Sequence, residues 1–118
     1  MIKDKIERQD LKLYFRKLHE IKMLEAECIE PDRNNKIQYK NYLKKCNKVS
    51  RLKNEISSVN VGFSLLTEDE KNILYQVCWQ QVPVNQVKNI YHVSTKTMGR
   101  WINKAMNKIN TVMGDLSD

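Results

Sequence analysis

The chain has 118 residues, of which 41% are hydrophobic and only three are Gly and two Pro, and its formal net charge is +7. This length fits one compact domain or a small domain with an extended arm, and the scarcity of Gly and Pro predicts an all-α fold. Three glycines make a nucleotide-binding loop improbable, and the chain has no paired-carboxylate cleft, Cys–His arrangement or metal-ligand spacing. We therefore expect no enzyme, no cofactor and no metal site. The positive charge favours a nucleic acid or an anionic membrane surface as the partner.

The cysteines and the distribution of apolar residues indicate a cytoplasmic protein. Cys28, Cys46 and Cys78 are far apart in sequence, odd in number and at apolar-periodic positions, which predicts buried free thiols in a reducing compartment. The N-terminus has no apolar run, so we expect no signal peptide. No window approaches the length of a membrane span, so we expect no membrane insertion.

Two long amphipathic helices are predicted in the first half of the chain. Apolar residues recur at steps of three and four over 2–30, which is the spacing of one helical face. Pro31 cannot lie in a helix interior, so "EPDRNN" is a break, after which Asp32 or Asn34 caps the next helix. A stripe close to a heptad repeat predicts that this next helix covers 36–59.

These two helices are expected to form a helical hairpin or coiled-coil arm. Their apolar stripes are too narrow for a globular core, so we expect a homodimer through residues 2–59. A line of basic residues follows the other side of the second helix, and it consists of Lys36, Lys40, Lys44, Lys48 and Arg51. That line either extends a DNA contact along the phosphates or is the solvated face of a coiled coil.

Three shorter helices are predicted after a hinge at 57–64, which contains Gly62. Thr67 and Glu70 form a capping box for the first of them, which ends at "QVP". The second covers about 84–91 and the third about 95–110, joined by an elbow of His92, Val93 and Ser94, with Ser94 as the cap. The predicted domains are an arm over 1–60, a helix-turn-helix unit over 65–112 and a frayed tail over 113–118.

The last predicted helix carries the candidate DNA-binding residues. Five basic residues and no acid occur between Val84 and Asn110, and a basic second helix after a short elbow is typical of a helix that enters the major groove. The residues expected to read base edges are Thr95, Lys96, Arg100 and Asn103. The residues expected to hold phosphates are Thr97, Lys88, Lys104 and Lys108. Gly99, which has no side chain on that face, would allow close approach to a sugar-phosphate edge.

The stretch "LTEDEKNIL … VNQVKNIYHVSTKTMGRWINKAMNKI" resembles region 4 of bacterial sigma factors over about 45 residues. The matching positions are Gln86-Val87, Val93-Ser94, Thr97-Met98, Lys104-Ala105 and Ile109. Lys88 stands where that family prefers a small residue, and His92 stands where it prefers Gly, which implies a left-handed backbone at His92. The resemblance implies a three-helix helix-turn-helix unit that binds double-stranded DNA.

The order of a helical arm followed by this unit is similar to small phage transcription regulators of the ArpU and RinA type. That similarity implies a phage-encoded activator of late genes, which would need contact with the host RNA polymerase. A DNA-packaging protein similar to a small terminase subunit is the second interpretation, although its DNA-binding unit usually comes first. A helical adaptor that binds protein and not DNA is the third.

Overall fold

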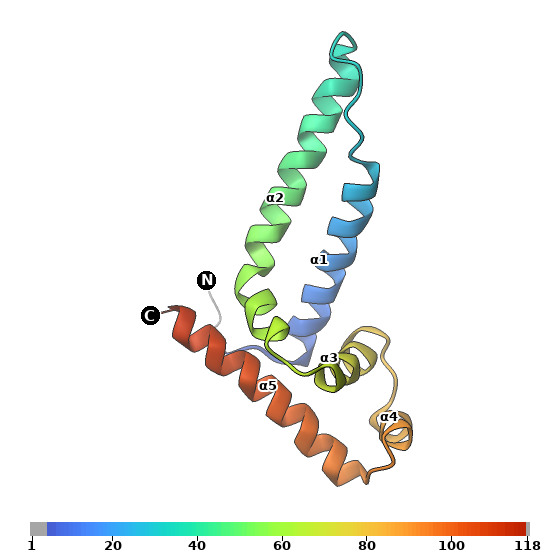
Figure 1. Cartoon of the computed structure of the whole chain (residues 1–118), viewed down its shortest axis with the longest axis vertical. Coiled ribbons are helices and arrows are strands. Elements are labelled where there is room, and N and C mark those ends of the chain that lie inside the picture. The colour runs from blue at the N-terminus through green and yellow to red at the C-terminus, as the bar shows by residue number, and fades with distance from the viewer. Residues whose placement is uncertain (1–4, 118) are drawn as a thin grey trace. The chain divides into compact units, whose positions relative to one another are not determined.

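The computed structural model describes residues 5–117 (Figure 1). The predicted helix start at residues 2–4 and the last residue, 118, lie outside this range. The elements are α1 (Arg8–Glu27), α2 (Lys36–Ser64), α3 (Glu68–Leu74), a π-helical turn η1 (Tyr75–Trp79), α4 (Val84–Ile90) and α5 (Thr95–Ser117). No strand occurs within residues 5–117, so the all-α class predicted from the sequence is confirmed.

The chain divides into two compact units whose boundaries fall inside α1 and α2. Among the described residues, we call 16–57 the paired-helix unit, and 5–15 with 58–117 the core unit. The start of α1 therefore packs with the segment that the sequence analysis assigned to a separate helix-turn-helix unit.

Local polar contacts explain where the two long helices begin. Before α1, the backbone N–H of Glu7 donates to the Asp10 carboxylate at 2.8 Å. Before α2, Asn35 is the cap, because its side-chain oxygen accepts from the N–H of Gln38 at 3.1 Å. The prediction that Asp32 or Asn34 caps this helix is wrong. The carboxylate of Asp32 instead accepts from the N–H of Asn34 within the turn.

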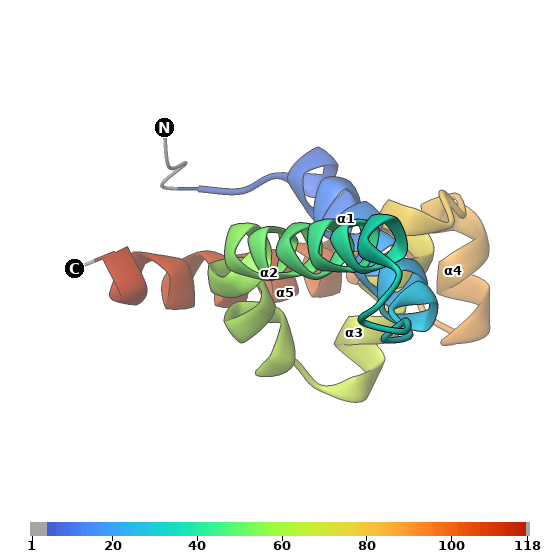
Figure 2. The ribbon, with the colours of Figure 1, turned by 90° about the horizontal axis from the view of Figure 1, so that it is seen from above.

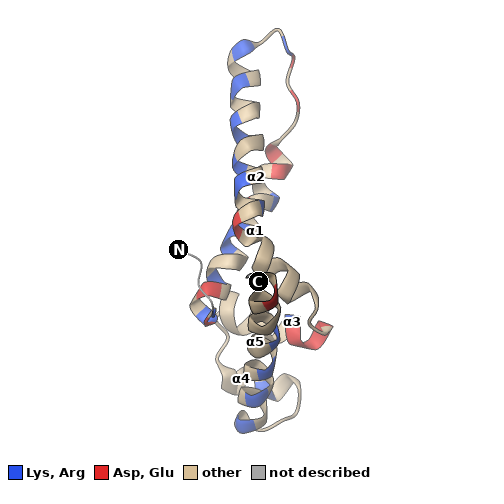
Figure 3. Cartoon of the chain, turned by 90° about the vertical axis from the view of Figure 1, so that its left-hand side faces the viewer, with Lys and Arg blue, Asp and Glu red and all other residues tan. Residues whose placement is uncertain are grey.

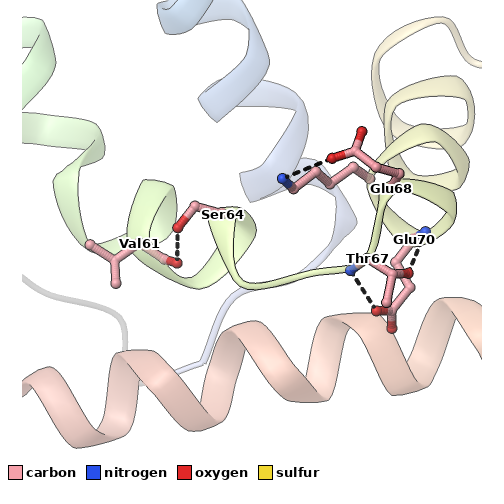
Figure 4. Close-up of polar contacts among 6 residues, drawn as sticks. Val61, Ser64, Thr67, Glu68 and Glu70 are labelled. Carbon is pink, nitrogen blue, oxygen red and sulfur yellow. Dashed lines mark hydrogen bonds and ion pairs between the residues drawn. The ribbon is translucent and has the colours of Figure 1, made fainter.

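The predicted hinge at 57–64 is wrong, because α2 continues through it to Ser64. The Ser64 hydroxyl donates to the carbonyl of Val61 at 2.7 Å in the last turn (Figure 4). Gly62 serves close packing here. A Cβ built on it would lie 3.1 Å from Cγ2 and 3.2 Å from Cα of Ile109, so α2 and α5 cross with almost no space between them.

The capping box predicted for α3 is confirmed. The Thr67 hydroxyl accepts from the N–H of Glu70 at 3.2 Å, and the Glu70 carboxylate accepts from the N–H of Thr67 at 3.0 Å (Figure 4). Glu68, Asp69 and Glu70 lie in the first turn of the helix, where the exposed backbone amides favour negative charge.

Both short connections around α4 use a left-handed backbone conformation. Gln81, between η1 and α4, has φ 57°, and His92, between α4 and α5, has φ 55°. The conformation expected at His92 is therefore confirmed. Ser94 caps α5 as predicted, since its hydroxyl oxygen accepts from the N–H of Thr97 at 3.1 Å.

The core unit is built around the inner face of α5, and α4 lies at the N-terminal end of that helix (Figures 1 and 2). The largest side chains with less than 2% exposure are all in this unit: Leu11, Leu74, Val87, Met98, Ile102 and Ile109. Phe15 packs edge-on against both Phe63 and Tyr75 with ring centroids 5.3 Å apart. On α4, Val87 is fully buried in this core, whereas Ile90 is 56% exposed.

The tail predicted as frayed is helical up to Ser117, since α5 continues well beyond Asn110. Just before the tail, Thr111 donates its hydroxyl to the carbonyl of Asn107 at 2.9 Å.

Four ion pairs join the two antiparallel helices of the paired-helix unit. Lys48 contacts Glu20 at 2.7 Å, and three further pairs join the helices: Lys17–Glu55 at 3.1 Å, Lys45–Glu27 at 3.5 Å and Lys53–Glu25 at 3.7 Å. Only four of its apolar side chains are buried: Ile21, Val49, Leu52 and Ile56.

The cysteines differ from the sequence expectation. Only Cys78 is buried, and burial raises the pKa of its thiol to about 11. Cys28 and Cys46 are half-buried. Burial and the neighbouring Cys46 thiol raise the pKa of Cys28, so these two cysteines are neighbours within the paired-helix unit.

Candidate nucleic-acid interface

The candidate interface is the outer face of α5. The inner face is fixed in the core unit by Met98, Ile102, Ala105 and Ile109, each at most 1% exposed. These residues recur at helical spacing, and exposed side chains such as Arg100 and Lys104 lie on the opposite face. The rotation of α5 is thereby set by packing, independently of any ligand.

All four residues predicted to read base edges are exposed on the core unit: Thr95, Lys96, Arg100 and Asn103. The Thr95 hydroxyl donates to the side-chain oxygen of Asn85 at 3.2 Å, which joins the first turn of α5 to α4. Arg100 and Asn103 lie three residues apart on one face of the helix, so both can approach the same ligand.

Arg100 and Asn103 line a groove of about 640 Å³ along α5. The other residues that line it are Leu65, Lys104, Asn107, Lys108, Thr111 and Val112. One end of the groove is therefore polar and cationic, whereas Leu65, Thr111 and Val112 make its other end more apolar. Guanidinium and amide groups side by side provide donors and acceptors for base edges or phosphates.

The residues predicted to hold phosphates differ in their environments. Lys104 is exposed, and Lys88 on α4 and Thr97 are half-buried. The Thr97 side-chain oxygen accepts from the Ser94 hydroxyl at 3.0 Å, so this threonine forms part of the cap of α5. Lys108 is held within the unit, because its ammonium group donates to the Glu70 carboxylate at 2.8 Å.

Glu70 therefore joins the cap of α3 to α5. One of its carboxylate oxygens accepts from both Thr67 and Lys108. Burial alone would raise the pKa of Glu70, but the hydrogen bonds from Lys108 and Thr67 lower it below its ordinary value. The positive charge of Lys108 is thus partly neutralised, which weakens its capacity to hold a phosphate in comparison with Lys104.

A second groove lies on the other flank of α5 and was not anticipated from the sequence. It is lined by Lys5, Ile6, Glu7, Arg8, Asn103, Met106, Asn107 and Asn110. Asn110 fixes the N-terminal segment there, since its side chain accepts from the N–H of Ile6 at 2.7 Å and donates to the Ile6 carbonyl at 3.3 Å. No local pattern could indicate this contact between opposite ends of the chain.

An aromatic pair lies beside the turn between α4 and α5. Tyr91 and Trp101 pack edge to face with ring centroids 6.2 Å apart. Trp101 remains 37% exposed, so part of its indole ring borders the outer face of α5.

Within residues 5–117, no three His, Cys, Asp or Glu side chains are grouped closely enough to hold a metal ion. None of the helices in that range combines the length and apolar character that crossing a bilayer requires.

Comparison of the chain with protein-family models, with curated proteins and with solved structures gave no match. The similarity to sigma factor region 4 therefore rests on the residues quoted from the sequence.

Proposed function

We propose that the chain is a sequence-specific regulator of transcription that binds double-stranded DNA, with residues 95–110 of α5 in the major groove. The observation that supports this best is the contrast between the two faces of α5. The inner face is fully buried, whereas the outer face exposes Lys96, Arg100, Asn103 and Lys104. No acid lies between Val84 and Asn110 to oppose a phosphate backbone.

The proposed contacts follow from side-chain chemistry. Arg100 can donate two hydrogen bonds to guanine, and Asn103 can pair with adenine. Lys96 and Thr95 lie in the first turn of α5, the end of a recognition helix that meets base edges. Lys104 and Lys88 supply phosphate contacts, Thr97 adds a hydroxyl, and Lys108 contributes after exchange of its Glu70 partner.

We further propose that the regulator acts as a homodimer through residues 2–59. The paired-helix unit buries few apolar side chains and exposes others, including Met23 at 64% and Leu43 at 45%, so a partner would remove apolar surface from water. The similarity to phage regulators leads us to propose activation of late genes in a phage, through contact with the host RNA polymerase.

Fluorescence anisotropy with a labelled duplex of random sequence tests DNA binding. We expect the full chain to bind at low salt, and Lys96→Ala with Arg100→Ala to weaken binding at least tenfold. Val61→Ala, an exposed change on α2 of the core unit, is the matched control. Absence of wild-type binding would favour a protein-binding adaptor, and unchanged binding by the double variant would remove α5 from the interface.

Selection of bound duplexes from a random pool, combined with a mass measurement, tests regulation. We expect an enriched inverted repeat and a dimer, because twofold protein symmetry is mirrored in paired half-sites. A pool without enrichment and a ring of many subunits would favour DNA packaging.

A further inference from the structure

Most of the net positive charge lies in the unit that does not contain α5. Residues 16–57 include eleven basic and six acidic side chains, so they carry five of the seven net positive charges of the chain. An interface limited to α5 leaves this concentration of charge without a function.

The lysines of α2 fall into two classes. Lys45, Lys48 and Lys53 each contact a carboxylate of α1, within 3.5, 2.7 and 3.7 Å respectively. These three hold the helices together, and their charges are matched.

The second class is the basic line, which we define as Lys36, Lys40 and Lys44. All three side chains are exposed, and none forms an ion pair with a carboxylate of residues 5–117. They repeat every four residues, which places successive ammonium groups on one side of the helix about 6 Å apart along its axis. Figure 3 shows the basic residues recurring along α2. Arg16 and Lys22 on α1 also form no such pair, but their spacing does not continue a line.

We propose that the basic line is a second DNA-binding surface, which contacts the phosphate backbone of duplex DNA without reading its sequence. A row of ammonium groups along one side of a helix faces the regular charge of a duplex, and neutralised phosphates release condensed counterions. This inference rests on the proposed function, which identifies the ligand as duplex DNA. It adds a contact that is separate from the one made by α5.

The surroundings of the basic line favour a duplex over an anionic membrane. A membrane-bound helix needs a continuous apolar face. Near the line, Ile37 and Leu43 are exposed, but the helical spacing places them on opposite flanks of the lysines. The more buried apolar face, which includes Val49 and Leu52, is occupied within the unit.

A comparison of two triple variants of the full chain tests the proposal. Lys36→Gln, Lys40→Gln and Lys44→Gln remove the basic line. Lys45→Gln, Lys48→Gln and Lys53→Gln remove the same number of charges from the same helix at positions that are ion-paired with α1. Anisotropy with a random duplex is measured over a series of salt concentrations, and circular dichroism checks that both variants fold.

We expect removal of the line to reduce the slope of log affinity against log salt by about 2–3 and the affinity at least about tenfold near 0.1 M salt, because each lost phosphate contact removes about 0.9 from the slope. The matched variant should change the slope by less than half as much. Replacement of the three line residues by Arg should restore the wild-type slope, since charge and not shape is required.

Equal slopes for the two glutamine variants, with the wild type binding normally, would overturn this proposal and leave the α5 interface intact. A wild-type chain that does not bind the duplex would overturn both. If the line variant instead loses binding only to vesicles of anionic phospholipid, the surface is a membrane contact and the proposal is wrong.

Discussion

The two units of the chain differ in the interactions that stabilise them. The core unit fully buries large apolar side chains, such as Leu74, Met98 and Ile102. The paired-helix unit buries few and instead matches lysines with glutamates across its helices, with Lys48–Glu20 at 2.7 Å as the shortest pair. Fully buried apolar side chains stabilise by several kcal/mol, whereas exposed ion pairs contribute about 0–1 kcal/mol each.

The well-packed core is therefore in one unit, and most of the net positive charge is in the other. The core unit fixes the direction of the outer face of α5 by packing, as a surface that reads bases requires. The paired-helix unit keeps most of the net charge on a weakly packed scaffold, which is sufficient for contacts that depend on charge alone. Substitutions in each unit test this contrast between burial and charge.

Ile102→Ala should have the largest effect on stability. The side chain is fully buried in the core unit, so its truncation leaves a cavity and should lower the free energy of unfolding by about 2–5 kcal/mol. Chemical denaturation measures the change, and Ile102→Val should cost only about 0.5–1.5 kcal/mol. A loss below 1 kcal/mol for the alanine variant would contradict a packed core around α5.

Oxidation should join Cys28 to Cys46 in the paired-helix unit. Hydrogen peroxide takes two electrons from the adjacent thiols and is reduced to water, and the disulfide should stabilise the unit by about 3 kcal/mol by restricting its unfolded state. Peptide mass mapping identifies the bond and thermal unfolding measures its effect. Cys28→Ser is the control, and the absence of a Cys28–Cys46 bond after oxidation would show that the two thiols do not come within bonding distance.

Gly62→Ala should destabilise the core unit by about 1–3 kcal/mol, because the added methyl group meets the backbone of Ile109. An alanine elsewhere in a helix normally stabilises it relative to glycine, so the sign of the effect is informative. A stabilised variant in denaturation experiments would mean that α2 and α5 do not cross closely at this point.

The features that the sequence predicted correctly are those set by neighbouring residues. The capping box of Thr67 and Glu70, the Ser94 cap and the left-handed His92 each depend on a few adjacent positions. The inner face of α5 likewise follows from local periodicity, since Met98 and Ile102 repeat at helical spacing and are both fully buried.

The features that it missed depend on residues far apart in the chain. Gly62 suggested a hinge because glycine is common in flexible segments, but its contact with Ile109 explains it better. No local sequence pattern indicated the ion pair of Lys108 with Glu70 or the contact of Asn110 with Ile6. These contacts determine which outward side chains of α5 remain free to contact a ligand. The helix could therefore be predicted better than the candidate interface on it.

Gly99→Ala and Gly114→Ala form a matched pair on α5. A Cβ at either position meets nothing within 4 Å, so each change should stabilise the helix by about 0.5–1 kcal/mol. Only Gly99 lies in the half of the helix proposed to approach DNA, so only Gly99→Ala should weaken duplex binding. Denaturation and anisotropy measure the two effects, and equal duplex affinities would argue against close approach at Gly99.

Lys48→Gln should have the smallest effect. Its ion pair with Glu20 is short, but both side chains are about half exposed, so solvent screens the interaction and the free energy of unfolding should fall by less than about 1 kcal/mol. A larger loss in chemical denaturation would mean that ion pairs stabilise the paired-helix unit as strongly as burial stabilises the core unit.

Nuclear magnetic resonance of the full chain during titration with duplex DNA tests the central proposal most directly. The side-chain signals of Arg100, Asn103 and Asn107 report on the outer face of α5, and the amide of Asn110, which is bonded to Ile6, provides an internal reference. We expect the first three to shift strongly and the Asn110 signal to shift little. Unchanged Arg100 and Asn103 signals at saturating duplex would contradict the assignment of α5 as the DNA-reading helix.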